Sequence, residues 1–294
     1  MKTFWIWSGC FWRLTMIQLN NVQKNYPGFR LDLNLEVPEN TITGLVGING
    51  SGKTTTFKIL TGLIRADAGE AILFGENAWS IRPALKQQLG GVFSDSGFAD
   101  CLTMKETGEI LRCFYPSYSA EQFNRLCQEM DLPMDKPLSG FSTGMKAKAK
   151  TIQAISHQPK LLILDEPTSG LDVIARNEIL RLLQDYMNVP GRSILISSHI
   201  ASDLESLCDD FYLIEEGTIR LHETVDDLLS HYGVLLADDE QMKNLDRAAV
   251  VSERKTPSGW RVLVSDRQYY QENYPDLVLD KGGIDDLLLI MEDR

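Results

Sequence analysis

A glycine-rich stretch, GINGSGKTT at residues 47–55, restricts the possible folds more than any other part of the sequence. It fits the pattern GxxxxGK[ST], follows the apolar run TITGLV and precedes the helix-like run TFKILTGL, which is the strand–loop–helix context of a phosphate-binding loop. Its glycines let backbone N–H groups point inward around a phosphate at a helix N-terminus. Lys53 would contact the β- and γ-phosphates, and the Thr54 hydroxyl would bind Mg²⁺. The residues expected to hold the nucleotide are Gly47, Asn49, Gly50, Ser51, Gly52, Lys53, Thr54 and Thr55.

The dinucleotide-binding pattern GxGxxG does not fit this stretch. A match that begins with Gly50 and Gly52 requires a third glycine at position 55, where the chain has threonine. A structural turn would explain any one of the glycines but not the whole string. We therefore expect this loop to bind a nucleotide.

Two acidic residues end the apolar run LLILDEP. Asp165 and Glu166 would emerge at the carboxyl end of a buried strand, where open α/β sheets bind their ligands. Asp165 could hold Mg²⁺ through water, and Glu166 could orient and deprotonate an attacking water. Two acids after a strand often cap a helix instead, but the phosphate-binding loop upstream favours the catalytic interpretation.

Short apolar runs alternate with helix-like runs over residues 16–230, which indicates an α/β domain with a mainly parallel sheet. Residues from about 97 to 158 contain several helical patterns and no strong strand, so we expect a helical insertion there. Residues 231–294 contain two strand-like runs around a turn and a final amphipathic piece, which predicts a small α+β appendage. Residues 1–15 are expected to be an N-terminal extension, either from an upstream start codon or as an interfacial membrane anchor.

Charge and composition exclude several classes of protein. The 41 acidic and 29 basic residues give a net charge of -12, so we expect no nucleic-acid partner. The five cysteines lack the spacing of a zinc site or a disulfide framework, which favours reduced thiols in a cytosolic protein. No run approaches the roughly 20 apolar residues that span a bilayer, so a role at a membrane would require another chain.

Three further strings complete an ordered set: FSTGMKAKAK from Phe141, SGLD from Ser169, and SSH ending at His199. With GINGSGKTT and LLILDEP they resemble the motifs of ABC-type ATPases, the nucleotide-binding subunits of ATP-binding-cassette transporters. The resemblance runs from Met16 to about Ser230. It implies a P-loop NTPase core with an antiparallel β subdomain and a helical insertion. It also implies a second ATPase subunit, and transmembrane permease subunits that hold the chain at the inner face of the cell membrane.

The same resemblance implies roles for five more residues. Tyr26 matches the aromatic residue that stacks on adenine, although it could also be an ordinary strand-end tyrosine. Ser142 and Gly144 match signature residues that face the γ-phosphate bound to the other subunit. Asp172 matches the aspartate that links the two sites, and His199 matches the histidine that contacts the γ-phosphate and steadies the attacking water.

The chain departs from the family pattern in two places. The signature, commonly LSGGQ, reads FSTGM here. The strand GGVF is usually followed by a glutamine that reaches Mg²⁺, and Ser94 takes its place. Ser94 or the next residue, Asp95, could bind the metal, or Ser94 could be an ordinary loop residue. These departures resemble a bacterial exporter branch of YtrB-like ATPases and bacitracin- or lantibiotic-resistance ATPases, which implies export of peptides or antibiotics.

Two other functions remain open at this point. Soluble ABC-type ATPases that act on ribosomes or DNA generally carry two cassettes or long coiled coils, and this chain has neither. A regulatory module that holds ATP without hydrolysing it would not require Glu166 and His199, although the serine at position 94 would suit it.

Overall fold

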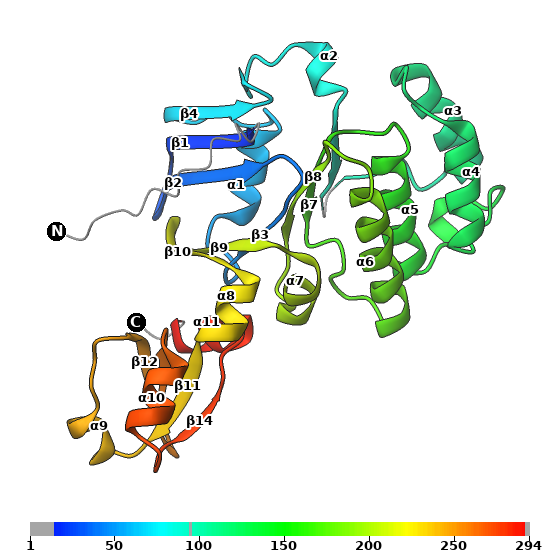
Figure 1. Cartoon of the computed structure of the whole chain (residues 1–294). Coiled ribbons are helices and arrows are strands. Elements are labelled where there is room, and N and C mark those ends of the chain that lie inside the picture. The colour runs from blue at the N-terminus through cyan, green and yellow to red at the C-terminus, as the bar shows by residue number, and fades with distance from the viewer. Residues whose placement is uncertain (1–14, 94–95, 292–294) are drawn as a thin grey trace.

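The computed structural model describes residues 15–93 and 96–291. Within these residues, the framework consists of a ten-stranded sheet, in the order β5-β4-β1-β2-β10-β9-β3-β8-β7-β6, and a four-stranded sheet, in the order β12-β13-β11-β14. The antiparallel strands β1, β2 and β4 and the helices α3 and α4 lie at opposite ends of the large sheet (Figure 1). The small sheet lies to one side of it and belongs to the C-terminal part of the chain.

One half of the large sheet is antiparallel. It consists of β1 (Thr15–Tyr26), β2 (Phe29–Pro38), β4 (Ala68–Leu73) and the short β5 (Glu76–Asn77). Alternate residues of β2, namely Leu31, Leu33 and Leu35, are buried, as the two-residue period of a strand requires. They share an apolar cluster with Phe57 of α1 (Lys53–Leu60), so α1 packs against this half of the sheet.

The other half of the large sheet is mainly parallel and carries the functional loops. Its strands are β3 (Ile42–Val46), β6 (Leu89–Val92), β7 (Leu161–Asp165), β8 (Ser193–Ser197), β9 (Asp210–Glu215) and the antiparallel β10 (Thr218–Thr224). In β7, Leu161 and Ile163 share a cluster with α1, whereas Leu162 and Leu164 pack with α6 (Val173–Met187) and α7 (Ala201–Leu207). Burial on both faces explains the unbroken apolar run of this strand.

The helical insertion is confirmed. All of residues 97–158 are described, and they contain helices and turns but no strand. The helices are α3 (Met104–Phe114), α4 (Ala120–Glu129), the 3₁₀ turn η1 (Leu138–Gly140) and α5 (Thr143–Ile155), preceded by the short α2 (Pro83–Lys86). Thr103 and Glu106 form a capping box that starts α3. Phe123 and Ile152 are fully buried and join α4 and α5 to the core.

The C-terminal part forms the four-stranded sheet and then returns to the large one. Its elements are α8 (Val225–His231), β11 (Gly233–Ala237), α9 (Gln241–Asn244), β12 (Val250–Thr256), β13 (Gly259–Val264), α10 (Arg267–Asn273), β14 (Val278–Lys281) and α11 (Ile284–Met291). The boundary expected at residues 230 and 231 falls in the last turn of α8.

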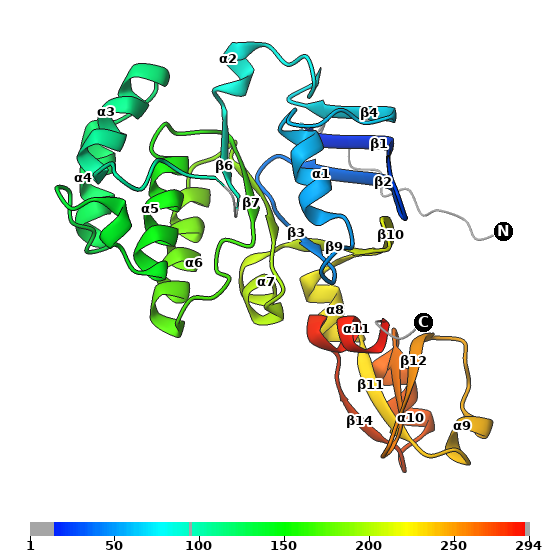
Figure 2. The ribbon, with the colours of Figure 1, turned by 180° about the vertical axis from the view of Figure 1, so that it is seen from behind.

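Helix α11 packs the C-terminal part against the part of the chain that forms the large sheet, and it lies beside α8 from both viewing directions (Figure 2). Ile284 and Leu287 are fully buried in the same apolar cluster as Leu204 of α7. The Ile284 backbone N–H donates to Oε1 of Glu205 at 2.7 Å. Helix α11 is therefore fastened to α7, which begins two residues after His199.

Candidate functional site

The loop between β3 and α1 borders a cavity of about 270 Å³. β3, β8 and β7 are adjacent and parallel, so the loops after these strands emerge at the same edge of the sheet. The residues that line the cavity are Phe29, Asn49, Gly50, Gly52, Lys53, Thr54, Thr55, Asp165 and Glu166. The fold thus brings the predicted phosphate-binding loop and the two predicted acidic residues to one cavity.

The loop has the geometry of an anion cradle. Gly52 adopts a φ of 115°, which favours glycine because other residues meet steric strain there. A Cβ atom on Gly47 would lie 2.3 Å from the carbonyl oxygen of Ile214, so only glycine allows this close approach. The Ser51 hydroxyl is buried and makes no hydrogen bond to any described residue. An orphaned buried hydroxyl in such a loop fits a phosphate oxygen as its missing partner.

Lys53 is buried at the start of α1, and its ammonium group is held by the loop itself. Its Nζ donates to the carbonyl oxygens of Gly47 at 2.6 Å and Ile48 at 3.1 Å. Burial lowers the pKa of Lys53, and the negative charges of Glu166 and Asp165 oppose that shift. A phosphate would provide the buried cation with a charged partner in place of neutral carbonyls.

Asp165 is the centre of a small polar network at the end of β7. Its Oδ2 accepts a hydrogen bond from the Thr54 hydroxyl at 2.8 Å, and its Oδ1 accepts one from the Ser197 hydroxyl at 2.7 Å. The Ser197 oxygen in turn accepts the Glu166 backbone N–H at 3.0 Å. Ser197, at the end of β8, therefore orients both acidic residues. Carboxylate and hydroxyl oxygens are ligands that Mg²⁺ prefers, so the donor set of Thr54 and Asp165 fits that ion.

Glu166 and His199 are in direct contact. Oε2 of Glu166 lies 2.6 Å from His199 Nδ1 and also accepts the His199 backbone N–H at 3.1 Å. The other carboxylate oxygen, Oε1, is buried and has no hydrogen-bond partner among the described residues. Glu166 also adopts a φ of 53°, a conformation that is strained for a residue other than glycine and that is found disproportionately at active sites.

The adenine-contacting residue predicted from the sequence lies near this cavity but not on its wall. Tyr26 is the last residue of β1, and its ring centroid is 6.5 Å from that of Phe29. Phe29 lines the cavity, whereas Tyr26 does not. Sequence reasoning missed Phe29, although it stands only three residues after Tyr26.

The remaining predicted residues lie elsewhere. Ser142 caps α5 by accepting the Met145 backbone N–H at 3.2 Å, and Asp172 caps α6. Neither residue, nor Gly144, lines the cavity, so the described chain alone does not bring them to its own phosphate-binding loop. Ser94, and with it Asp95, lies outside the described residues.

A second cavity, of about 610 Å³, opens beside the first and includes residues that sequence reasoning missed. Its walls are Gly47, Ile48, Asn49, Glu166, Ser169, His199, Asp285 and Leu288. Asp285 and Leu288 belong to α11, so the C-terminal part of the chain reaches the surroundings of Glu166 and His199. No motif in the sequence signals this contact.

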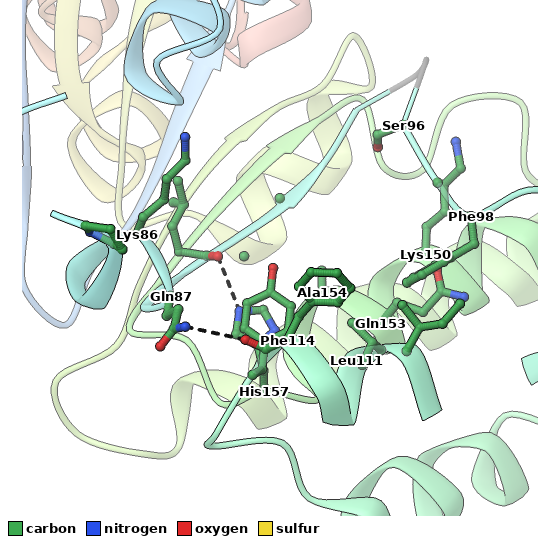
Figure 3. A pocket seen from close by; sticks show the side chains of 17 residues that line it. Lys86, Gln87, Ser96, Phe98, Leu111, Phe114, Lys150, Gln153, Ala154 and His157 are labelled. Carbon is green, nitrogen blue, oxygen red and sulfur yellow. Dashed lines mark hydrogen bonds between the residues drawn. The ribbon is translucent and has the colours of Figure 1, made fainter. Parts of the chain in front are cut away.

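A groove of about 600 Å³ separates the large sheet from the helical insertion. Figure 3 shows Phe98, Leu111 and Phe114 among the side chains that line it, together with Lys86 and Lys150. Phe114, at the end of α3, is 70% exposed. An exposed aromatic side chain in a concave apolar surface is typical of a protein–protein contact.

Comparisons with known proteins agree with the nucleotide-binding geometry of this site. The sequence profile of the ABC transporter family matches residues 31–169. The chain is 32% identical over 219 residues to the ABC transporter ATP-binding protein YtrB of Bacillus subtilis, which covers 74% of this chain and 75% of that protein. The chain belongs to the ABC transporter ATP-binding proteins.

Two further relatives of this ABC transporter subunit have named transport roles. It is 33% identical over 244 residues to the bacitracin transport ATP-binding protein BcrA of Bacillus licheniformis, covering 82% of this chain and 79% of that one. It is also 33% identical over 215 residues to the lantibiotic transport ATP-binding protein SrtF of Streptococcus pyogenes, covering 72% of this chain and 92% of that one.

Solved structures agree with the fold of this ABC transporter subunit. The ATP-binding subunit of an ABC transporter superposes with a TM-score of 0.66 at 26% identity, over 73% of this chain and 92% of that one. A nucleotide-free ATP-binding cassette from an ABC transporter superposes with a TM-score of 0.63 at 19% identity, over 78% of this chain and 94% of that one. The predicted α/β P-loop fold is confirmed. The protein is the ATP-binding subunit of an ABC transporter and an ATPase. Of the described helices, none is long and apolar enough to cross a bilayer.

Proposed function

We propose that this ATPase drives a bacterial exporter of antibiotic peptides, and that Glu166 and His199 carry out its hydrolytic step. One observation carries the assignment of the catalytic pair. His199 occupies one oxygen of the Glu166 carboxylate, while the other oxygen is buried, unpaired among the described residues and adjacent to the phosphate-binding loop. A carboxylate held on one side and free on the other is suited to accept a proton from an attacking water.

The roles of the other residues follow from their positions. Backbone N–H groups of the loop and the Lys53 ammonium bind the phosphates and neutralise their charge. Thr54 and Asp165 would hold Mg²⁺, which neutralises phosphate charge when it is bound. Because Nδ1 of His199 faces Glu166, Nε2 is the ring nitrogen left to contact the γ-phosphate. Tyr26 and Phe29 offer aromatic faces for adenine.

Hydrolysis is expected to require a second ATPase subunit. Ser142 and Gly144 lie away from the phosphate-binding loop of their own chain, so each would serve the nucleotide bound to the partner. Two exposed apolar residues at the start of α6 support a contact with a partner subunit. Val173 and Ile174, directly after Asp172, are 69% and 74% exposed. Large apolar side chains exposed side by side commonly mark an interface.

The groove between the sheet and the helical insertion is the proposed docking site for the permease. It joins the helices to β6, the strand next to β7. A helix from the permease that packs on Phe114 could therefore shift the insertion relative to the hydrolysis site. This contact would hold the chain at the inner face of the membrane. Export of antibiotic peptides is proposed because two relatives transport bacitracin or a lantibiotic.

The hydrolytic assignment is tested by steady-state ATPase measurements on the purified protein, with and without its permease. Glu166→Gln should abolish turnover while ATP binding persists, because the amide cannot accept a proton. Glu253→Gln, at a half-buried position on β12, is the matched control and should behave as wild type. Full turnover in Glu166→Gln would refute the catalytic pair, and no turnover in wild type with its permease would favour a regulatory ATP-binding module.

The partner assignment is tested by co-purification. Phe114→Ala should reduce recovery of the permease, whereas Trp79→Ala should not, because Trp79 is also exposed, at 52%, but does not line the groove. Equal recovery with both variants would contradict the docking site. Transport is tested separately: expression of the transporter should raise resistance to bacitracin or a lantibiotic, and Glu166→Gln should remove that resistance.

A further inference from the structure

A buried carboxylate outside the hydrolysis cavity joins two loops that border it. Asp203 stands in the first turn of α7, and its side chain is 1% exposed. It does not line either cavity beside the phosphate-binding loop, and none of the roles proposed above uses it. A buried charge requires a strong partner, because desolvation of an unpaired carboxylate is very unfavourable.

Both oxygens of Asp203 bind the segment that follows Glu166. Oδ2 accepts a hydrogen bond from the hydroxyl of Thr168 at 2.6 Å, and Oδ1 forms an ion pair with Nε of Arg176. Thr168 is fully buried and stands two residues after Glu166. Arg176 lies in the first turn of α6, just after Asp172. One carboxylate therefore fastens both ends of the loop formed by residues 168–172.

Asp203 also restrains the loop that contains His199, because that loop leads into the first turn of α7, where Asp203 lies. Helix α7 begins at Ala201, two residues after His199, so a contact that holds the first turn of α7 also limits the movement of His199. His199 in turn contacts Glu166 through its Nδ1 and its backbone N–H. Glu166, Thr168, Asp203 and His199 thus form a closed ring of contacts made from two loops that are about 30 residues apart in the chain.

We propose that Asp203 is a positioning residue for ATP hydrolysis: it locks the loop of residues 168–172 to the His199 loop, so that Glu166 and His199 hold a common geometry. The proposal rests on the catalytic roles assigned above to Glu166 and His199. The proposed role concerns hydrolysis and not ATP binding, because Asp203 and Thr168 line neither cavity beside the phosphate-binding loop.

The test uses variants that remove one contact of Asp203 at a time. Thr168→Val has nearly the same shape and removes only the hydroxyl, whereas Thr168→Ser keeps it. Asp203→Asn keeps the size and one acceptor oxygen but removes the charge opposite Arg176. We expect Thr168→Val and Asp203→Asn to lower kcat about tenfold or more, since displacements near 1 Å can slow catalysis that much. The Kd for a fluorescent ATP analogue should stay within about twofold of wild type, and Thr168→Ser should retain most of the turnover.

Two comparisons separate positioning from a general loss of stability. Ile179→Val removes a methylene from a fully buried side chain one turn further along α6, and it should destabilise the protein without the kcat loss. The double variant Thr168→Val with Asp203→Asn should be no slower than Asp203→Asn alone, because both substitutions break one connection. Should either variant fail to fold, Arg176→Gln removes the other contact at a partly exposed side chain and should lower kcat in the same way.

Three results would overturn the proposal: equal turnover of Thr168→Val and Thr168→Ser, a kcat loss in Ile179→Val as large as in Thr168→Val, or a loss of ATP affinity that parallels the loss of kcat. Failure of the proposed function would be seen in a different measurement, as turnover that persists in Glu166→Gln.

Discussion

Ser197→Ala tests the network that holds the two acidic residues. The Ser197 hydroxyl is buried and donates to Asp165 at 2.7 Å, so the substitution removes one hydrogen bond to a charged acceptor. Such bonds contribute about 1.5–3 kcal/mol. The Glu166 backbone N–H also reaches the Ser197 carbonyl oxygen at 3.2 Å and keeps that partner, and loss of one oxygen atom leaves little empty space. We therefore expect the free energy of unfolding to fall by about 2 kcal/mol.

In a chain of this size, about 2 kcal/mol corresponds to a fall in Tm of about 5 °C, which calorimetry without nucleotide or Mg²⁺ would measure. The substitution also frees Asp165 to rotate. Loss of a group that orients a metal ligand typically weakens metal binding by about 10–100-fold. The Mg²⁺ concentration for half-maximal ATPase activity should therefore rise about tenfold.

Ser193→Ala is the matched control. Ser193 is also fully buried, stands at the other end of β8 and donates to the Pro38 carbonyl oxygen at 2.9 Å. Because that acceptor is neutral, Ser193→Ala should lower the free energy of unfolding by about 1 kcal/mol. The Mg²⁺ dependence of the ATPase activity should not change. The reasoning is refuted if Ser197→Ala loses no more stability than Ser193→Ala and keeps the wild-type Mg²⁺ dependence.

Three other predictions follow from single side chains. Tyr26→Ala should raise the Kd for ATP about tenfold through lost base stacking but leave binding of inorganic triphosphate unchanged; equal losses in calorimetric titrations would contradict the adenine contact. Burial lowers the pKa of His157 below its ordinary value of 6.5. As pH drops below about 6.5 the unfolded chain takes up a proton that the folded chain does not, so stability should fall. His157→Gln should weaken that decline in Tm, and an unchanged pH dependence would assign it to other groups. Ile284→Ala should lower the free energy of unfolding by about 2–5 kcal/mol because the side chain is fully buried, whereas Leu229→Ala, at a partly exposed position on α8, should have a smaller effect on Tm.

Much of the fold was predictable because its signals are local. The apolar runs at residues 42–46, 89–92, 161–165 and 193–197 became β3, β6, β7 and β8, and the helical patterns at residues 97–158 became α3, α4 and α5. Two strands of the C-terminal sheet, β11 and β14, were not predicted. β11 is the apolar run GVLLA, in which four of the five residues are buried, and β14 is four residues long with mostly exposed side chains, so neither shows a clear two-residue period.

The predicted phosphate-binding loop depends on backbone geometry within one short segment, so the sequence by itself pointed to it: a loop such as GINGSGKTT is suited to bind phosphate through its own N–H groups. The tertiary structure alone decided which distant groups meet that loop. The order β3-β8-β7 brings Ser197 to Asp165 across 32 residues, the packing of α7 on α6 brings Asp203 to Thr168, and the docking of α11 brings Asp285 near Glu166. These contacts depend on strand order and helix packing, and a single stretch of sequence carries no signal for either.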